Sequence, residues 1–306
     1  MDFRDSLFDA IHAIMRDDPA VVVITNDMSA MKLDAIRQQW PERVLNIGIA
    51  EQNMMSVAGG MARCGKKIFG FGIGAHLATR AWEQIKLDIC ALNLPVMLIG
   101  VGGGLAYGND GITHHATEDV ALMLTLPNMA IYNPCDPVVT MLSVNHAYRR
   151  GGPAYLRLDK EQVQEMYKPD DNVDTGFAVF REGNDATLLS TGVITYKALA
   201  AADLLAAEDI KIRVVDVSRL KPFSDDAWQA AIGKPKHVFT LEEHNTRNAF
   251  GSQAAVYLAT HGGARLTMLG LPDAFLQGSA SRPWAHEQFG LTPDAIAARI
   301  RETVKA

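Results

Sequence analysis

The sequence has 306 residues, of which 48% are hydrophobic and 21% charged, and its formal net charge at pH 7 is −6. This composition is typical of a globular protein and excludes a disordered or fibrous chain. The acidic balance, without a basic cluster, argues against a nucleic-acid partner. The three cysteines lie far apart and form no C-x-x-C pair, which argues against a disulfide framework or a cysteine metal site.

The first segment predicts a helix rather than a targeting signal. Residues 3–15 carry apolar side chains at helical spacing, interrupted by acidic residues. A signal peptide would need a basic start followed by an uninterrupted apolar run. The most apolar stretch, residues 95–101, is too short to cross a bilayer. We therefore expect a cytoplasmic protein with no membrane partner.

Short β-branched runs then alternate with amphipathic segments. This alternation is typical of an α/β protein, a doubly wound and mostly parallel sheet covered by helices. The expected strands are residues 21–25, 67–73, 96–101, 130–133 and 154–158. The further expected helices are residues 51–62, 77–92 and 137–148.

A polar stretch at residues 161–175 interrupts the pattern and is interpreted as an interdomain linker. The alternation then restarts. Expected strands follow at residues 187–191, 212–217, 238–242 and 266–269, with helices at 196–207, 249–261 and 293–303. We therefore predict a first domain over residues 1-160, a linker over 161-175 and a smaller α/β domain over 176-306.

Open parallel sheets bind ligands beyond the carboxyl ends of their strands. Three segments of the predicted first domain occupy such positions. Thr25-Asn26-Asp27 follows the first strand, Gly48-Ile49-Ala50-Glu51 opens a helix, and residues 102–115 form a long glycine-rich loop. Long loops inside compact domains are usually functional.

Two other glycine-rich segments resemble nucleotide-binding loops but do not match the complete motifs. Residues 60–66 fit most of a P-loop, yet Lys67 stands where Ser or Thr should hold Mg²⁺, and the segment precedes a strand. Residues 70–75 fit G-x-G-x-x-A at a strand-to-helix turn. The acid that should hold the ribose is missing, which disfavours a nicotinamide cofactor.

Glu51 has a structural explanation, because acids are favoured in the first turn of a helix. Its apolar neighbours, among them Ile49 and Met54, instead suggest a buried junction, where a carboxylate needs a strong partner. His114 and His115 are adjacent, so they point to opposite sides of an extended segment and cannot easily chelate one ion. We expect no metal ligand in this chain. One histidine suits an acid/base role, and the other suits a structural hydrogen bond.

Several motifs, in order over nearly the whole chain, resemble the transketolase family. Those of the pyrimidine-binding domain are Asn46-Ile-Gly-Ile-Ala-Glu51-Gln-Asn-Met, Arg80-Ala-Trp-Glu-Gln-Ile-Lys86 and Asp110-Gly-Ile-Thr-His114, the last resembling a D-G-P-T-H loop. Those of the C-terminal domain are Gly192-Val-Ile-Thr-Tyr-Lys197 and Leu241-Glu-Glu-His244.

The resemblance implies thiamine diphosphate as cofactor and assigns roles to individual residues. Glu51 would hydrogen-bond the aminopyrimidine ring and so activate the cofactor. His114 would contact substrate oxygens and help to move protons, while Asp110 would read a substrate hydroxyl. Asp27 and Met28 match positions that line the cofactor pocket.

The sequence also departs from the family pattern. The aromatic residue expected on the pyrimidine face is replaced by His76 or Leu77. Arg4 and Lys160 match or lie near phosphate-binding positions of sugar-phosphate enzymes. Two further residues, Met31 and Gly102, stand where a phosphate-binding serine and a histidine are expected. This pattern indicates a sugar acceptor that lacks a terminal phosphate or is held differently.

The family's G-D-G motif, which binds Mg²⁺ and the diphosphate, does not occur in this sequence. We therefore expect an N-terminal, diphosphate-binding transketolase subunit as partner, in an α₂β₂ assembly that transfers a two-carbon ketol unit from a ketose to an aldehyde. One alternative is the β-subunit of a 2-oxoacid dehydrogenase or a synthase-type thiamine enzyme, against which the D-G-x-T-H loop argues. Another is a non-catalytic partner-binding subunit, against which Glu51 argues.

Overall fold

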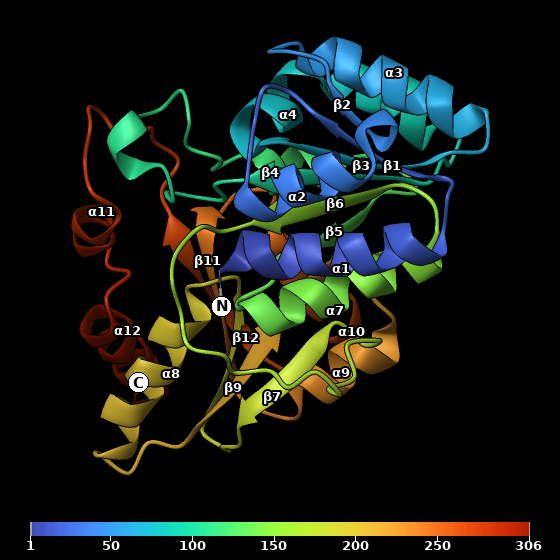
Figure 1. Ribbon diagram of the computed structural model, residues 1–306. Helices are drawn as coiled ribbons and strands as arrows, with labels where there is room; N and C mark the ends of the chain where they lie inside the picture. The colour runs from blue at the N-terminus through green and yellow to red at the C-terminus, as the bar shows by residue number, and fades with distance from the viewer. Residues whose placement is uncertain (1, 306) are drawn as a thin grey trace.

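The computed structural model describes residues 2–305, which form two β-sheets with helices on their faces (Figure 1). The first sheet has seven strands in the order β10-β5-β6-β4-β3-β1-β2. All pairs in it are parallel except β10 with β5. Its strands are β1 (Val21–Thr25), β2 (Val44–Asn46), β3 (Lys67–Ile73), β4 (Val96–Val101), β5 (Ala130–Tyr132), β6 (Ala154–Leu158) and β10 (Arg219–Lys221).

Helices cover both faces of this sheet. Because successive strand residues point to opposite faces, Val21 and Val23 pack against one helix layer, and Val22 and Ile24 against the other. One layer comprises α1 (Phe3–Asp17), α2 (Met31–Gln39) and α7 (Pro137–Arg150), with α1 and α7 side by side (Figure 1). The other comprises α3 (Glu51–Arg63), α4 (Gly74–Arg80), the π-helical turn η2 (Ile85–Cys90) and α6 (Asp119–Leu124).

The second sheet has five strands in the order β12-β11-β8-β9-β7, with only β7 antiparallel to its neighbour. These strands are β7 (Phe177–Arg181), β8 (Ala186–Thr191), β9 (Ile212–Val217), β11 (His237–Asn245) and β12 (Arg265–Leu271). One face carries α8 (Thr195–Ala206), α11 (Arg282–Gln288) and α12 (Pro293–Lys305). The other face carries α9 (Asp225–Ile232) and α10 (Phe250–His261).

The two sheets are joined more closely than a linker alone would join them. Strand β10 lies in the second half of the sequence but pairs with β5 of the first sheet. One apolar core also continues from Met123 and Ile131 to Leu220, Trp228 and Phe250. The sheet and the core that the two units share therefore fix their relative position. The segment from β6 to β7 has no helix or strand, and the domain bounds 1-160 and 176-306 stay a prediction.

The predicted α/β class with mostly parallel sheets is confirmed, and each predicted strand is present. Strands β2, β7 and β10 and helices α2, α6, α9 and α11 were not predicted. The strands at residues 21–25, 67–73, 96–101, 154–158 and 212–217 agree at both ends. The single helix predicted over residues 77–92 is wrong. The chain instead forms α4, then the short helix α5 (Trp82–Gln84), then η2, because the α-helical geometry is interrupted at Ala81.

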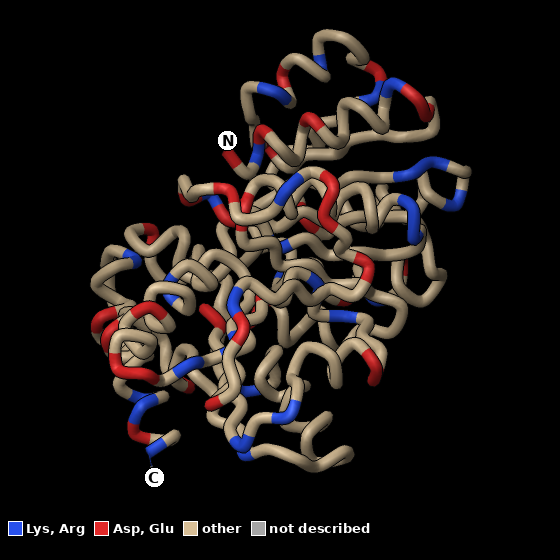
Figure 2. Tube along the Cα trace, turned by 90° about the horizontal axis from the view of Figure 1, so that it is seen from below, with Lys and Arg blue, Asp and Glu red and all other residues tan. Residues whose placement is uncertain are grey.

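Within residues 2–305, no helix combines the length and apolarity that crossing a bilayer requires. Basic and acidic residues are interspersed along the trace (Figure 2). Within the same residues, no group of three or more His, Cys, Asp or Glu side chains is arranged to hold a metal ion.

A buried carboxyl in the second unit predicts a pH-dependent stability. Burial raises the pKa of Asp216 to about 7, and nearby Asp136 contributes to the rise against hydrogen bonds from Tyr167 and Thr195. The folded protein therefore holds a proton that the unfolded chain releases near its ordinary pKa of 3.8. The contribution of Asp216 to the free energy of unfolding must therefore fall as pH rises from about 4 to about 7.

The variant Asp216→Asn tests this expectation, because an amide cannot ionise and the two hydroxyls can turn to accept from it. In urea unfolding at pH 5 and pH 8, the wild type should lose more stability than the variant across this interval. Each pKa unit corresponds to about 1.4 kcal/mol. An equal loss in both proteins would contradict the role given to Asp216.

Candidate active site

The candidate site is centred on Glu51, the first residue of α3. Its side chain is only 1% exposed, although it lies beside Ile49, which is 74% exposed. Asn26, which follows β1, donates from Nδ2 to Glu51 Oε1 at 3.0 Å. Arg80, the last residue of α4, donates from Nη1 to Oε2 at 2.6 Å. Glu51 thus has the strong partners that a buried carboxylate requires.

The ionisation of Glu51 depends on opposing effects. Burial raises the pKa of this carboxyl, whereas its own backbone N–H at the helix start, the Arg80 guanidinium and His76 lower it. The lowering effects prevail, so the pKa of Glu51 lies below its ordinary value. Glu51 is consequently a carboxylate at neutral pH in the isolated chain.

His76 connects Glu51 to the glycine-rich loop. Its Nδ1 lies 3.8 Å from Glu51 Oε1, and its Nε2 lies 3.0 Å from the carbonyl oxygen of Thr113. The rings of His76 and His114 are 5.1 Å apart, and His114 Nδ1 pairs with Thr113 Oγ1 at 2.9 Å. The structure therefore brings Glu51, His76 and His114 together. Leu77, in contrast, is fully buried and packs in the hydrophobic core.

Tyr107 closes the other side of His114. The two rings are 5.8 Å apart, and Lys160 Nζ lies 3.8 Å from the Tyr107 ring centroid. The Tyr107 ring occupies the space beside Gly102, where an added Cβ would come within 2.0 Å of it. Gly102 also has a φ of +86°, which favours glycine. The unexpected glycine is thus explained by the adjacent aromatic ring.

Arg4 and Asp110 lie in the electrostatic surroundings of Tyr107. Burial raises the pKa of Tyr107, Arg4 opposes this shift, and Asp110 adds to it. Arg4 is itself paired with Asp2, with Nε 3.3 Å from Oδ1. Asp110 belongs to the short 3-10 turn η3 (Gly108–Asp110) and is exposed. Both residues are thus accessible near the ring that borders His114.

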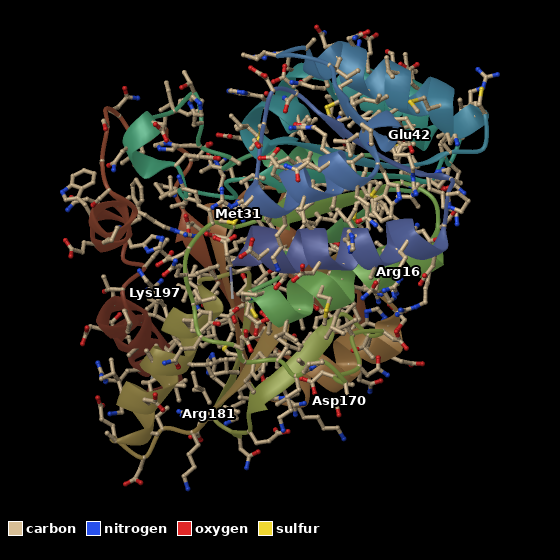
Figure 3. All side chains as sticks on the ribbon, in the orientation of Figure 1. Arg16, Met31, Glu42, Asp170, Arg181 and Lys197 are labelled. Carbon is tan, nitrogen blue, oxygen red and sulfur yellow. The ribbon has the colours of Figure 1, made fainter. Side chains whose placement is uncertain are left out.

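The turn after β1 holds the remaining predicted residues. Asp27 has a φ of 62°, and its backbone N–H donates to Asn46 Oδ1 at 2.9 Å. Met28 packs on the core from a partly exposed position, and Met31 at the start of α2 is 86% exposed (Figure 3). Asn26, in the same turn, donates a hydrogen bond to Glu51 and so places the turn beside it.

The glycine-rich loop is anchored by a buried ion pair. Asp119 accepts from Arg157 Nε at 3.0 Å and from the Tyr155 hydroxyl at 2.8 Å. Arg157 also donates to the carbonyl oxygens of Ala116 and Glu243, which joins the loop to the second unit. These contacts fix the position of the loop that carries His114.

His115 has the structural role expected for one of the two histidines. Its side chain is buried, and Nε2 lies 3.1 Å from the carbonyl oxygen of Gly108. The glycines of the G-x-G-x-x-A segment are explained by packing. An added Cβ would come within 2.8 Å of Met54 at Gly70 and within 2.7 Å of Asn26 at Gly72.

Sequence analysis placed Asn26, Arg80 and Tyr107 in candidate segments but gave none of the three a role in the site. Arg80 could have been found, because it follows His76 by four residues and so shares its helix face. Asn26 was singled out by its place at the carboxyl end of β1, but its bond to Glu51 depends on how β1 and α3 pack. The position of Tyr107 depends on how the long loop folds back, for which no local signal exists.

Comparison with protein families gives two matches that divide the chain between them. Residues 1–165 match the family described as "Transketolase, pyrimidine binding domain". Residues 177–296 match "Transketolase, C-terminal domain". The two matches follow the order of the two sheets.

Individual proteins are similar over nearly the full length of the chain. One subunit of the apulose-4-phosphate transketolase from Actinobacillus succinogenes is 31% identical, over 94% of this chain and 93% of that protein. A 6-deoxy-6-sulfo-D-fructose transketolase subunit from a Clostridium species is 31% identical, over 99% and 94%. A solved structure described as "Split gene transketolase, inactive beta4 tetramer" is 33% identical, with a TM-score of 0.90 over 100% of this chain and 99% of that one.

Proposed function

Because this chain belongs to the transketolase family, we propose that it is one subunit of a split enzyme that transfers a two-carbon ketol unit from a ketose to an aldehyde. The observation that carries the proposal is the buried carboxylate of Glu51 beside a histidine-bearing loop. A chain with only a binding role would have no need to bury a carboxylate between Asn26 and Arg80 at a strand end.

The residues around Glu51 suit the aminopyrimidine ring of thiamine diphosphate. Glu51 provides a carboxylate, and Asn26 Oδ1 is a buried acceptor with no hydrogen-bond partner among the described residues. Such an acceptor is suited to a donor group of a ligand. The partly exposed His76 ring provides a flat neighbour. When bound, the cofactor supplies a carbon nucleophile and an electron sink.

The chain's own side chains would divide the remaining work. Glu51 would hold the proton at the pyrimidine ring nitrogen, with Asp27 and Met28 lining the pocket and His76 beside the ring. His114 would hold and move a proton at a substrate oxygen. Asp110, Arg4 and Lys160 would contact the substrate, a role that their nearness to the Tyr107 ring supports.

We assign Mg²⁺ and the diphosphate mainly to a partner subunit in an α₂β₂ assembly. The similar protein from Actinobacillus succinogenes is named as one subunit of its enzyme, and the similar tetramer of β chains is described as inactive. The strongly exposed apolar side chains of Met31 and Ile49 near the candidate site suit burial under a partner.

Reconstitution tests this proposal. The purified chain alone should show no ketol transfer, and addition of a diphosphate-binding transketolase subunit with thiamine diphosphate and Mg²⁺ should produce it. The assay should offer aldehyde acceptors with and without a terminal phosphate, since Gly102 and Met31 alter the expected phosphate contacts. Full activity of the isolated chain would contradict the split-enzyme proposal. Decarboxylation of a 2-oxoacid, in place of ketol transfer, would favour the dehydrogenase alternative.

A further inference from the structure

A cavity lies where the two units meet, and of its lining residues only Lys160 belongs to the candidate active site. Its volume is about 560 Å³, and it borders α8, α11 and the loop after β4. Figure 3 shows Lys197 of α8 close to the C-terminal helices. The charged and titratable residues that line the cavity are Lys160, Glu161, Tyr196, Lys197, Glu243, Arg282 and His286.

The two most enclosed cations of this cavity have different partners. Arg282 contacts the carboxylates of Asp159, Glu161 and Glu243 at 2.8, 2.7 and 2.6 Å. Lys197 instead donates from Nζ to the ring nitrogen Nδ1 of His286. An amine that donates to a ring nitrogen can pass its proton along that contact. Lys197 is therefore placed to become a neutral amine inside a cavity.

Glu243 supports such a proton transfer from the far side of the imidazole. His286 Nε2 is enclosed and lies 3.2 Å from Glu243 Oε2, outside hydrogen-bonding geometry but within ion-pair distance. Glu243 is fixed in place by the backbone N–H of Leu105 and by Arg282. A carboxylate so placed favours a positive charge on the imidazole. The three side chains form the series carboxylate, imidazole, amine that activates nucleophiles in enzymes.

The surroundings of Lys197 make its charged form less favourable than that of an exposed lysine. Burial lowers the pKa of Lys197, and Arg282 lowers it further, while Glu243, Glu161 and Glu287 oppose the shift without reversing it. A lysine in such a position is more nucleophilic at neutral pH than an exposed one, because more of it is present as the free amine.

We propose that Lys197 is a covalent capture site for small aldehydes, with His286 as its base. His286 accepts a proton from the ammonium group, and the free amine forms an N–C bond to the aldehyde carbon while the carbonyl electron pair moves to oxygen. One amine proton passes to that oxygen, and the proton on His286 then lets the hydroxyl leave as water. The product is a protonated imine, so atoms and charge balance. That the captured molecules are aldehydes rests on the proposed function, whereas the reactivity of the Lys197 amine does not depend on it.

Lys221 offers a matched control within the same chain. It is partly buried, and burial lowers its pKa as well. Its ammonium group, however, donates to the carbonyl oxygens of Leu124 and Leu126 at 3.1 and 2.7 Å, which cannot accept a proton outright. Lys168 is exposed, and its rate of modification serves as the reference for a lysine in contact with solvent.

The test treats the full chain at pH 7 with glyceraldehyde and sodium cyanoborohydride, which traps imines, and measures adducts by mass spectrometry. Lys197 should be modified several-fold faster than Lys168, because more of it is present as the free amine, and Lys221 no faster than Lys168. The His286→Gln variant should bring Lys197 down to the rate of Lys168. The readout is a mass increment, so it is independent of ketol transfer.

Two results would overturn the proposal. One is modification of Lys197 at or below the rate of Lys168, and the other is a folded His286→Gln protein with an unchanged Lys197 rate. If that variant does not fold, the wild-type pH profile decides. The Lys197 rate should then reach its plateau at a lower pH than the Lys168 rate, and coincident profiles would reject the assignment.

Discussion

Replacing Glu51 with glutamine is expected to reduce ketol transfer by the reconstituted enzyme by about 10²- to 10⁴-fold, the range that a positioned acid/base group contributes. Glutamine has nearly the same shape and keeps one acceptor for Asn26 or Arg80. It cannot exchange a proton with a ring nitrogen, so the loss should fall on turnover. The measurement is kcat and KM for the donor ketose, with the cofactor at saturation.

The fold should tolerate this change. Arg80 is 47% exposed in its side chain, so water can solvate the guanidinium that loses its carboxylate. The matched control is Glu42→Gln, an exposed glutamate on the side of the first unit away from the second (Figure 3). Glu42→Gln should leave turnover within a factor of about two, as expected for an exposed surface residue. Equal turnover in the Glu51→Gln enzyme and the wild type would remove Glu51 from the proposed mechanism.

The role proposed for Glu51 could be inferred from sequence, but the details of its environment could not. The motif from Asn46 to Met54 pointed to Glu51. Its ionisation state stayed open, because burial raises the pKa of a carboxyl whereas a helix N-terminus lowers it. The structure decides that question through Arg80, a residue from another helix. The choice between His76 and Leu77 was likewise open, because neighbours on a helix point in different directions.

The elements of the fold were predictable to different degrees for related reasons. Strands such as β1, β4 and β6 are buried along their whole length, and this produces apolar runs that are visible in sequence. Strand β10 is a short segment with two basic residues, and among the described strands it pairs only with β5, at the edge of the first sheet. Its position depends on long-range pairing, which local patterns do not record.

The second large effect is expected from Asp119→Ala, which should destabilise the chain by about 3–5 kcal/mol, the usual result of leaving one buried charge without its partner. Arg157 is 5% exposed, and without Asp119 its guanidinium would keep mainly the carbonyl oxygens of Ala116 and Glu243. The Tyr155 hydroxyl would lose its acceptor as well. Urea unfolding followed by circular dichroism measures the change.

The control for this prediction is another aspartate–arginine pair of the same chain. Asp203 and Arg181 form an ion pair on the surface, with side chains 68% and 32% exposed. Asp203→Ala should therefore cost less than about 1 kcal/mol. Because Asp119 orients the Arg157 side chain that holds Ala116, Asp119→Ala should loosen the loop that carries His114. Ketol transfer should then fall even at urea concentrations at which the protein is still folded, which Asp203→Ala should not cause. Equal losses of stability and of ketol transfer in the two variants would mean that the buried Asp119–Arg157 pair does not set the position of the loop.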